Sequence, residues 1–335
     1  MVKPYLNSLQ IFRGYAALAV VVYHSSQYTS QLVSPLPIVW ENFFKLGMYG
    51  VDFFFVLSGF IIMNAHLNDP KNYTSIKNYL YKRVTRIYPP YLPVSITLIS
   101  LYFLMPGLSS ADREISILSS IFLLPSNEPP ALSVAWTLIH EIIFYSIFLS
   151  YFLGERLFFS ILVFWTLLIF MASPIYQTAG WEHYFLSYYN LDFMIGVISV
   201  LILNRWGNKI SSRYCLIFGT VIFLLILCLI YFNQPLGNSL TLSIPLAVMI
   251  LGVVINEREH TRSFSSLLAL IGNASFAIYL IHVPLLSITQ RIAGLLDLIW
   301  PLAILFGFCL SILAGIAYHK WFEIPVIHKF RILRR

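Results

Sequence analysis

Apolar runs long enough to cross a bilayer fill most of this chain and restrict it to a membrane-spanning, all-α fold. A spanning helix needs about 20 mainly apolar residues, and the lipid core offers its backbone no other hydrogen-bond partners. The 335 residues are 59% hydrophobic and only 10% charged, with a mean hydropathy of +0.78. We therefore expect a polytopic membrane protein with one integral-membrane domain over residues 1–335 and about ten spans. The expected spans are 9–28, 46–66, 90–107, 134–153, 157–173, 187–203, 214–232, 239–256, 274–294 and 299–319.

Three shorter segments lie beside these spans. The segment 75–88 reads as an amphipathic cytoplasmic helix that ends at Pro89 and Pro90, because proline cannot continue a helix. The segment 115–124 is too short to cross and is expected to be interfacial or re-entrant, and a short helix is expected at 263–272. No convincing cleavage site follows the first apolar run, so it is expected to be retained.

The basic residues predict the orientation. With the N-terminus inside, 17 of the 21 Lys and Arg fall in the inside segments and 3 fall outside, while Arg13 lies within a span. This bias places both termini in the cytoplasm. The net charge of +7 needs no nucleic acid as a partner, because cytoplasmic loops that meet membrane lipids collect Lys and Arg. The 3 cysteines have no metal-like spacing, and no metal is expected.

Arg13 and His24 are the most informative polar residues of the first span. Eleven residues correspond to about 20° more than three full helical turns, so both side chains share one helix face, roughly 16 Å apart along the axis. Ionisable residues within a span are costly and usually face a partner, a cavity or a pathway. The pair therefore predicts a polar seam through the membrane.

Two groups of polar residues follow from the expected orientation. His24, Asp52, Glu141 and also Asp192 fall in the outer half if their helices are neighbours. An imidazole with a carboxylate behind it can take a proton from a hydroxyl. Arg13, Arg83 and Arg86 fall on the cytoplasmic side, where guanidinium groups suit phosphates. The pattern predicts acyl transfer from a cytoplasmic coenzyme A (CoA) thioester to a glycan hydroxyl outside.

Five ordered motifs resemble the family-3 membrane acyltransferases, bacterial integral-membrane enzymes that O-acylate cell-surface glycans. The resemblance covers nearly the whole chain and is greatest for the succinoglycan exopolysaccharide acetyltransferase branch. The motif residues are Arg13 and His24; Gly50 to Asp52 with Ser58 to Phe60; Arg83, Arg86, Ile87 and Pro89; Trp136 to Leu138 with Glu141, Phe144 and Tyr145; and Ser275, Tyr279, Leu280 and His282.

The resemblance implies ten core spans in the bacterial inner membrane, an acetyl-CoA-type donor and an exported or lipid-linked glycan acceptor. His24 is the expected general base, with Asp52 or Glu141 orienting it. Arg13, Arg83 and Arg86 are expected to hold the donor phosphates. Trp136, Tyr145, Tyr279 and His282 are expected to line the substrate tunnel.

Structural explanations remain open for these residues. His24 could supply only an interhelical hydrogen bond, and Arg83 and Arg86 could simply obey the topology rule. Ser58 and Gly59 could be only a small-residue packing contact, the alternative being a serine nucleophile. His140 projects about 100° away from its neighbour Glu141, and its role is open. The rival function is a polytopic transporter of a glycan or small anion, in which the same seam is the pathway. Transporters commonly contain internal repeats, and the sequence shows none.

Overall fold

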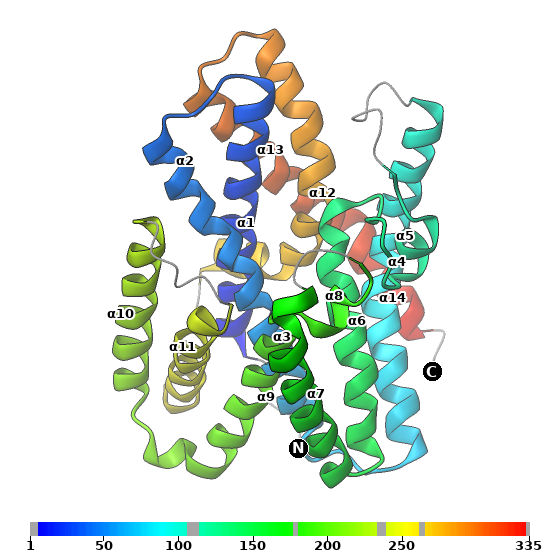
Figure 1. Cartoon of the computed structure of the whole chain (residues 1–335), viewed down its shortest axis with the longest axis vertical. Helices are drawn as coiled ribbons and strands as arrows, with labels where there is room; N and C mark the ends of the chain where they lie inside the picture. Colours follow the sequence, from blue (N-terminus) through cyan, green and yellow to red (C-terminus); the bar gives the residue numbers. More distant parts are fainter. Residues whose placement is uncertain (1–5, 106–113, 177–179, 233–238, 261–264, 333–335) are drawn as a thin grey trace. The chain divides into compact units, whose positions relative to one another are not determined.

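The computed structural model describes residues 6–105, 114–176, 180–232, 239–260 and 265–332, and Figure 1 shows the helices and the loops that they form. Within these ranges there is no strand, which confirms the predicted all-α class. The main helices are α1 (Asn7–Leu32), α2 (Ile38–Lys45), α3 (Gly50–His66), α4 (Tyr73–Leu104), α5 (Ile117–Phe122), α6 (Trp136–Phe148), α7 (Glu155–Tyr176), α8 (His183–Leu186), α9 (Tyr189–Trp206), α10 (Ser212–Tyr231), α11 (Ser239–Glu259), α12 (Ser266–Leu295), α13 (Trp300–Tyr318) and α14 (Ile324–Ile332). Short turns, among them η1 (Leu46–Tyr49) and the π-helical η6 (His319–Glu323), join some of them.

Nine stretches of helix in the described ranges are long and apolar enough to cross a membrane, so the protein is polytopic. They match the second to tenth predicted spans. The first predicted span is helical throughout as α1, whose 26 residues are long enough to cross, but it is not among the nine. Its polar residues, including Gln10, Arg13 and His24, lower its hydropathy. The inside location of the termini stays a prediction, and Lys3, Arg113, Arg262, Arg334 and Arg335 of its basic count lie outside the described residues.

The predicted end of a helix at Pro89 and Pro90 is wrong. Residues 73–104 form one helix, α4, which contains both prolines and Pro93 (Figure 1). Proline is tolerated in a spanning helix when neighbouring groups satisfy the local backbone. The Tyr318 hydroxyl also donates to the Pro90 carbonyl over 2.7 Å, which ties α4 to the end of α13. For the short helix predicted at 263–272, residues 263 and 264 lie outside the described residues, and residues 266–272 are the first part of α12.

Two compact units interleave along the chain. The first comprises residues 1–68, 188–276 and 285–313, and the second comprises 69–187, 277–284 and 314–335. The prediction of one domain over 1–335 therefore stays a prediction, and each unit is described by itself below.

Glycines set the close helix packing of the first unit. A Cβ added at Gly59 of α3 would lie 2.0 Å from the Phe193 carbonyl oxygen of α9, and one at Gly196 of α9 would lie 2.0 Å from the Val56 oxygen of α3. Only glycine permits backbones to approach this closely. Gly59 is therefore a packing contact, as the structural explanation of its motif held. At the start of α1, the Glu257 carboxylate of α11 accepts hydrogen bonds from the backbone N–H groups of Asn7 (2.8 Å) and Ser8 (3.2 Å).

Aromatic side chains form much of the core of the second unit. Tyr79 of α4 is fully buried, its ring lies 5.6 Å from that of Phe148, and its hydroxyl donates to the Tyr145 carbonyl of α6 over 3.0 Å. The Tyr81 hydroxyl donates to the carbonyl of Phe330, so that α14 lies along α4. This packing holds the arginine-bearing turns of α4 against α6 on one side and η6–α14 on another.

Candidate active site

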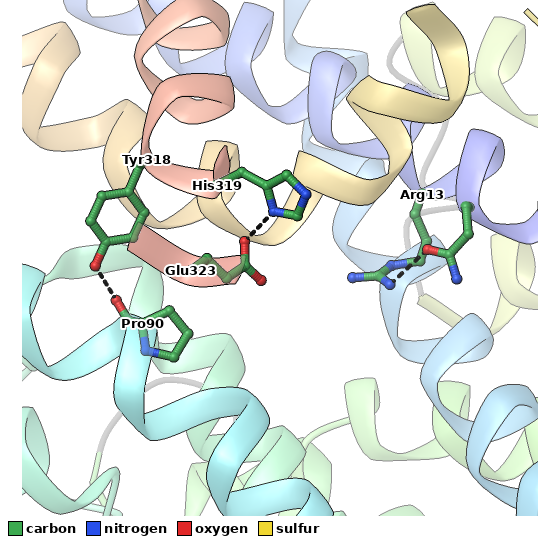
Figure 2. Close-up of polar contacts among 6 residues, drawn as sticks. Arg13, Pro90, Tyr318, His319 and Glu323 are labelled. Carbon is green, nitrogen blue, oxygen red and sulfur yellow. Dashed lines mark hydrogen bonds and ion pairs between the residues drawn. The ribbon is translucent and has the colours of Figure 1, made fainter. Parts of the chain in front are cut away.

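Arg13 and His24 of α1 are both half-buried in the first unit. The Arg13 Nη1 donates to Gln10 Oε1 over 3.0 Å (Figure 2). The His24 Nδ1 lies 3.1 Å from the Val20 carbonyl oxygen, one turn earlier in the helix, and the ring packs 4.9 Å from that of Tyr23. Because a carbonyl can only accept, Nδ1 carries the hydrogen, and the lone pair of the neutral ring is on Nε2. This arrangement leaves Nε2 able to accept a proton.

Close contacts fix the register of α1 against η1 and α3. A Cβ at Gly47 would lie 2.2 Å from the Ala19 oxygen, one at Gly50 would lie 2.6 Å from the Ala16 oxygen, and the rings of Phe12 and Phe53 are 5.9 Å apart. The helices are therefore antiparallel, and Asp52 is level with the turn of α1 that carries Arg13.

This register differs from the depth expected for Asp52. At 1.5 Å per residue, Asp52 is about 15 Å along the axis from the level of His24. The reason is that the helical stretch starts at Ile38 rather than at 46, so Asp52 lies well inside the stretch and not near its end. The pairing of Asp52 with His24 stays a prediction, and the register makes Arg13 the nearer of the two.

Asp52 belongs to a buried acidic cluster between α3, α9 and α11. Its side chain is 2% exposed, and its Oδ1 has no hydrogen-bond partner among the described residues. Asp52 lies seven residues before Gly59 and so shares the face of α3 that packs on α9. Phe55 of α3 packs against Tyr189 and Phe193 of α9, with ring centres 5.7 and 4.7 Å apart, and Asp192 of α9 accepts a hydrogen bond from Ser243 of α11 over 2.5 Å. Tyr189 and Ser243 were missed from the sequence because no motif or helical spacing marks them.

The second unit contains a buried arginine. Arg83 of α4 is 9% exposed, and its Cζ lies 5.6 Å from the ring centre of Tyr79 and 5.2 Å from that of Tyr145. Its Nε has no hydrogen-bond partner within the described ranges. A buried charge ordinarily pairs with an opposite charge or lies where a charged ligand binds. The position therefore suits an anion.

Glu141 and Tyr145 of α6 adjoin this arginine. The Tyr145 hydroxyl donates to the half-buried Glu141 carboxylate, and the Tyr145 ring centre lies 5.2 Å from the Arg83 Cζ. The structure thus brings together three predicted site residues, Arg83, Glu141 and Tyr145, and Arg86 follows one turn along α4 from Arg83. Tyr79 completes the group. Its i, i+4 spacing from Arg83 could have identified it, because residues four apart on a helix are neighbours.

The predicted tunnel residues of α6 and α12 form a separate set of contacts in the second unit. The hydroxyls of Thr137 and Tyr279 are 3.0 Å apart, and the His282 Nδ1 lies 2.7 Å from the Tyr279 carbonyl oxygen. The Trp136 ring lies 5.7 Å from that of His140, which is fully buried. These contacts bring Tyr279 and His282 together, while their role as a tunnel lining stays a prediction.

An apolar cavity of about 430 Å³ lies in the first unit, lined by residues of α1, α2, η1, α3, α10 and α11. Arg13, His24 and Asp52 are not among its lining residues, which are nearly all hydrocarbon or aromatic. It therefore suits a hydrocarbon chain and not the polar step of a reaction. No group of three or more His, Cys, Asp or Glu that could hold a metal ion occurs in the part of the chain that the structure describes.

Comparisons with known proteins agree with this chemistry. The sequence model of a family described as an acyltransferase domain matches residues 6–320. The exopolysaccharide production protein ExoZ of Rhizobium meliloti is 29% identical over 310 residues, which are 87% of this chain and 93% of that protein. The peptidoglycan O-acetyltransferase OatA of Listeria monocytogenes is 25% identical over 332 residues, 87% of this chain and 51% of that protein. No solved structure matches the chain.

Proposed function

Since the chain belongs to the acyltransferase-domain family and is a multi-pass membrane enzyme, we propose that it transfers an acetyl group from acetyl-CoA to a hydroxyl of an exported or lipid-linked bacterial glycan. The polysaccharide acceptor is supported by the names of two relatives, one for exopolysaccharide production and one for peptidoglycan O-acetylation. The proposed location is the inner membrane, with the donor entering from the cytoplasm. Family membership favours this enzyme over the transporter alternative.

The observation that carries the proposal is Arg83. Arg83 is 9% exposed, its guanidinium lies beside two tyrosine rings, and its Nε has no hydrogen-bond partner in the described structure. Such a guanidinium suits a phosphate, whose oxygens can accept hydrogen bonds from its planar donor edge. Arg86, one turn along the same helix, supplies a second positive charge. We assign the donor phosphates to these two residues in the second unit. Arg13 in the first unit remains proposed for the same ligand and is tested by its own variant.

His24 is proposed as the general base for the acceptor. Its Nδ1 is held by the Val20 carbonyl, so its Nε2 can take the proton of a sugar hydroxyl. The hydroxyl oxygen then forms a bond to the acyl carbonyl carbon, the carbon–sulfur bond breaks, and CoA leaves as the thiolate. Glu141 remains proposed to stabilise the charged imidazole, and Asp52, about 15 Å along the axis from the level of His24, remains proposed as a site residue at the level of Arg13.

The donor assignment is tested with Arg83→Gln in detergent-purified protein or nanodiscs, using radiolabelled acetyl-CoA and bacterial polysaccharide. Loss of a charge-assisted phosphate contact costs about 1.5–3 kcal/mol, so we expect KM for acetyl-CoA to rise about 10- to 100-fold. Arg205→Gln is the matched control, because Arg205 also stacks on an aromatic ring, at 5.3 Å from Trp206, but is exposed. An unchanged KM in a folded Arg83→Gln protein would remove the phosphate assignment.

The base assignment is tested with His24→Ala in the same assay. Transfer to the glycan should be lost while the protein stays folded in the membrane and still binds CoA. The exposed His260 provides the control variant, His260→Ala. Full activity of the His24→Ala protein would show that another group takes the proton.

A further inference from the structure

A buried histidine–carboxylate pair lies in the second unit and is not used by the proposed mechanism. His319 and Glu323 are four residues apart in η6, and the His319 Nδ1 lies 2.6 Å from Glu323 Oε2 (Figure 2). Both residues are buried. The segment is π-helical. Single π-helical turns within longer helices are rare overall, but those that occur often lie at functional sites.

Two contacts place this pair beside the arginine-bearing part of α4. The Tyr318 hydroxyl donates to the Pro90 carbonyl, and the Tyr81 hydroxyl donates to the Phe330 carbonyl. The segment from 318 to 330 therefore runs antiparallel to α4. Interpolation between the two contacts puts Glu323 level with Arg86 and His319 level with Pro89. About 4.5 Å, a little less than one helical turn, separates these two levels.

The hydrogen bond fixes which ring nitrogen is available. An ionised carboxylate can only accept, so Nδ1 carries the hydrogen, and in the neutral ring Nε2 is a hydrogen-bond acceptor. Nε2 lies on the other side of the ring from Glu323 (Figure 2). An acceptor at this place suits a ligand group that carries an O–H or N–H and lies one turn beyond the phosphates.

We propose that His319 binds the pantetheine arm of the CoA donor, with Glu323 as the residue that positions its ring. The arm continues from the diphosphate and carries a hydroxyl and amide N–H groups, which are donors of the kind that Nε2 can accept. This inference rests on the proposed function, because it takes Arg83 and Arg86 as the phosphate ligands. His319 would then give the site specificity for CoA. The arginines hold any nucleotide with these phosphates, and His319 favours a nucleotide that carries the pantetheine arm.

The test compares the binding of two ligands to the full-length protein by calorimetry. CoA has the arm, and 3′-phospho-ADP has the same nucleotide and phosphates without it. In His319→Phe an aromatic ring stays but the acceptor is lost. We expect CoA to bind about 10-fold more weakly while 3′-phospho-ADP binds as before. Arg83→Gln should weaken both ligands. The exposed His328 of the neighbouring helix α14 gives the control variant, His328→Phe, which should change neither.

Glu323→Gln gives a second, independent variant. A glutamine amide can donate to Nδ1, which moves the ring hydrogen to Nε2 and turns the acceptor into a donor. The same selective loss of CoA binding is expected. If the unaltered protein binds neither ligand, the proposed donor is wrong and the role of His319 falls with it. If it binds both, and the His319 and Glu323 variants lose neither or lose both equally, only the role of His319 is refuted.

Discussion

Gly59 is a position at which a single methyl group should disturb the packing of α3 on α9 beside Asp52. A Cβ at this position would lie 2.0 Å from the carbonyl oxygen of Phe193 and 2.8 Å from its carbon. These are backbone atoms of α9, and they cannot rotate away as a side chain can. Atoms at real Cβ positions essentially never approach closer than 3.0 Å, so α3 and α9 must separate locally by about 1 Å in Gly59→Ala.

The cost of this separation follows from what the two helices share. Overpacking in a dense interior typically costs about 1–3 kcal/mol. The rings of Phe55 and Phe193, 4.7 Å apart, lose contact as the helices move, and Asp52 lies on the same face of α3 as Gly59. We therefore expect a lower midpoint of unfolding and a clear loss of acetyl transfer in the surviving folded protein.

The assay is thermal unfolding of the purified protein in one detergent, together with acetyl transfer normalised to folded protein. Gly154→Ala is the control, because a Cβ at Gly154 would meet no atom within 4 Å. The reasoning is refuted if Gly59→Ala unfolds at the same temperature as the Gly154→Ala protein. Normal acetyl transfer in a destabilised Gly59→Ala protein would show that the close packing of α3 on α9 is not needed for the function of the acidic cluster.

Two further substitutions test single contacts of the first unit. Glu257→Gln removes the negative charge of the carboxylate that accepts hydrogen bonds from the first N–H groups of α1. It should destabilise the protein by ~1 kcal/mol, measured by thermal unfolding. The control is Glu259→Gln, which alters a hydrogen bond to Ser212 at the exposed end of α11 and should have little effect. Asp52→Asn replaces a buried carboxylate whose Oδ1 has no partner in the described structure. It should lower acetyl transfer without lowering the unfolding temperature, and a large loss of stability would instead make Asp52 a structural residue.

Hydropathy and motif spacing predicted most of the fold, because the bilayer imposes one length scale and one type of secondary structure on every span. The predictions erred where a local rule from water-soluble proteins was applied to such a helix. Pro89 and Pro90 were expected to end a helix, yet α4 continues past both. The first predicted span is different. It is helical as α1, but the polar residues that predict its function make it less apolar than the nine helices that could cross a membrane. Functional residues and span-forming residues compete for the same positions in α1.

The sequence could predict candidate site residues but not the contacts between their side chains. A motif reports one helix at a time, so it could identify Arg83 and Glu141 but not the Tyr79 ring that adjoins Arg83. Depth in the membrane was judged from the predicted ends of spans. For Asp52 this failed because η1 joins α2 to α3 and extends the helical stretch to Ile38.

The revised depth of Asp52 changes which chemistry its position supports. Level with Arg13 and about 15 Å from the level of His24, its carboxylate is too far along the axis to orient that imidazole directly in the described arrangement. His319, in the second unit, has a carboxylate on its Nδ1. The arrangement sought from the sequence at His24 therefore occurs at another position, while the ring of His24 is held by the Val20 carbonyl of its own helix. A base oriented by a backbone carbonyl keeps its tautomer but gains no countercharge, so stabilisation of the imidazolium in the transfer step must come from a group other than the one that orients the ring.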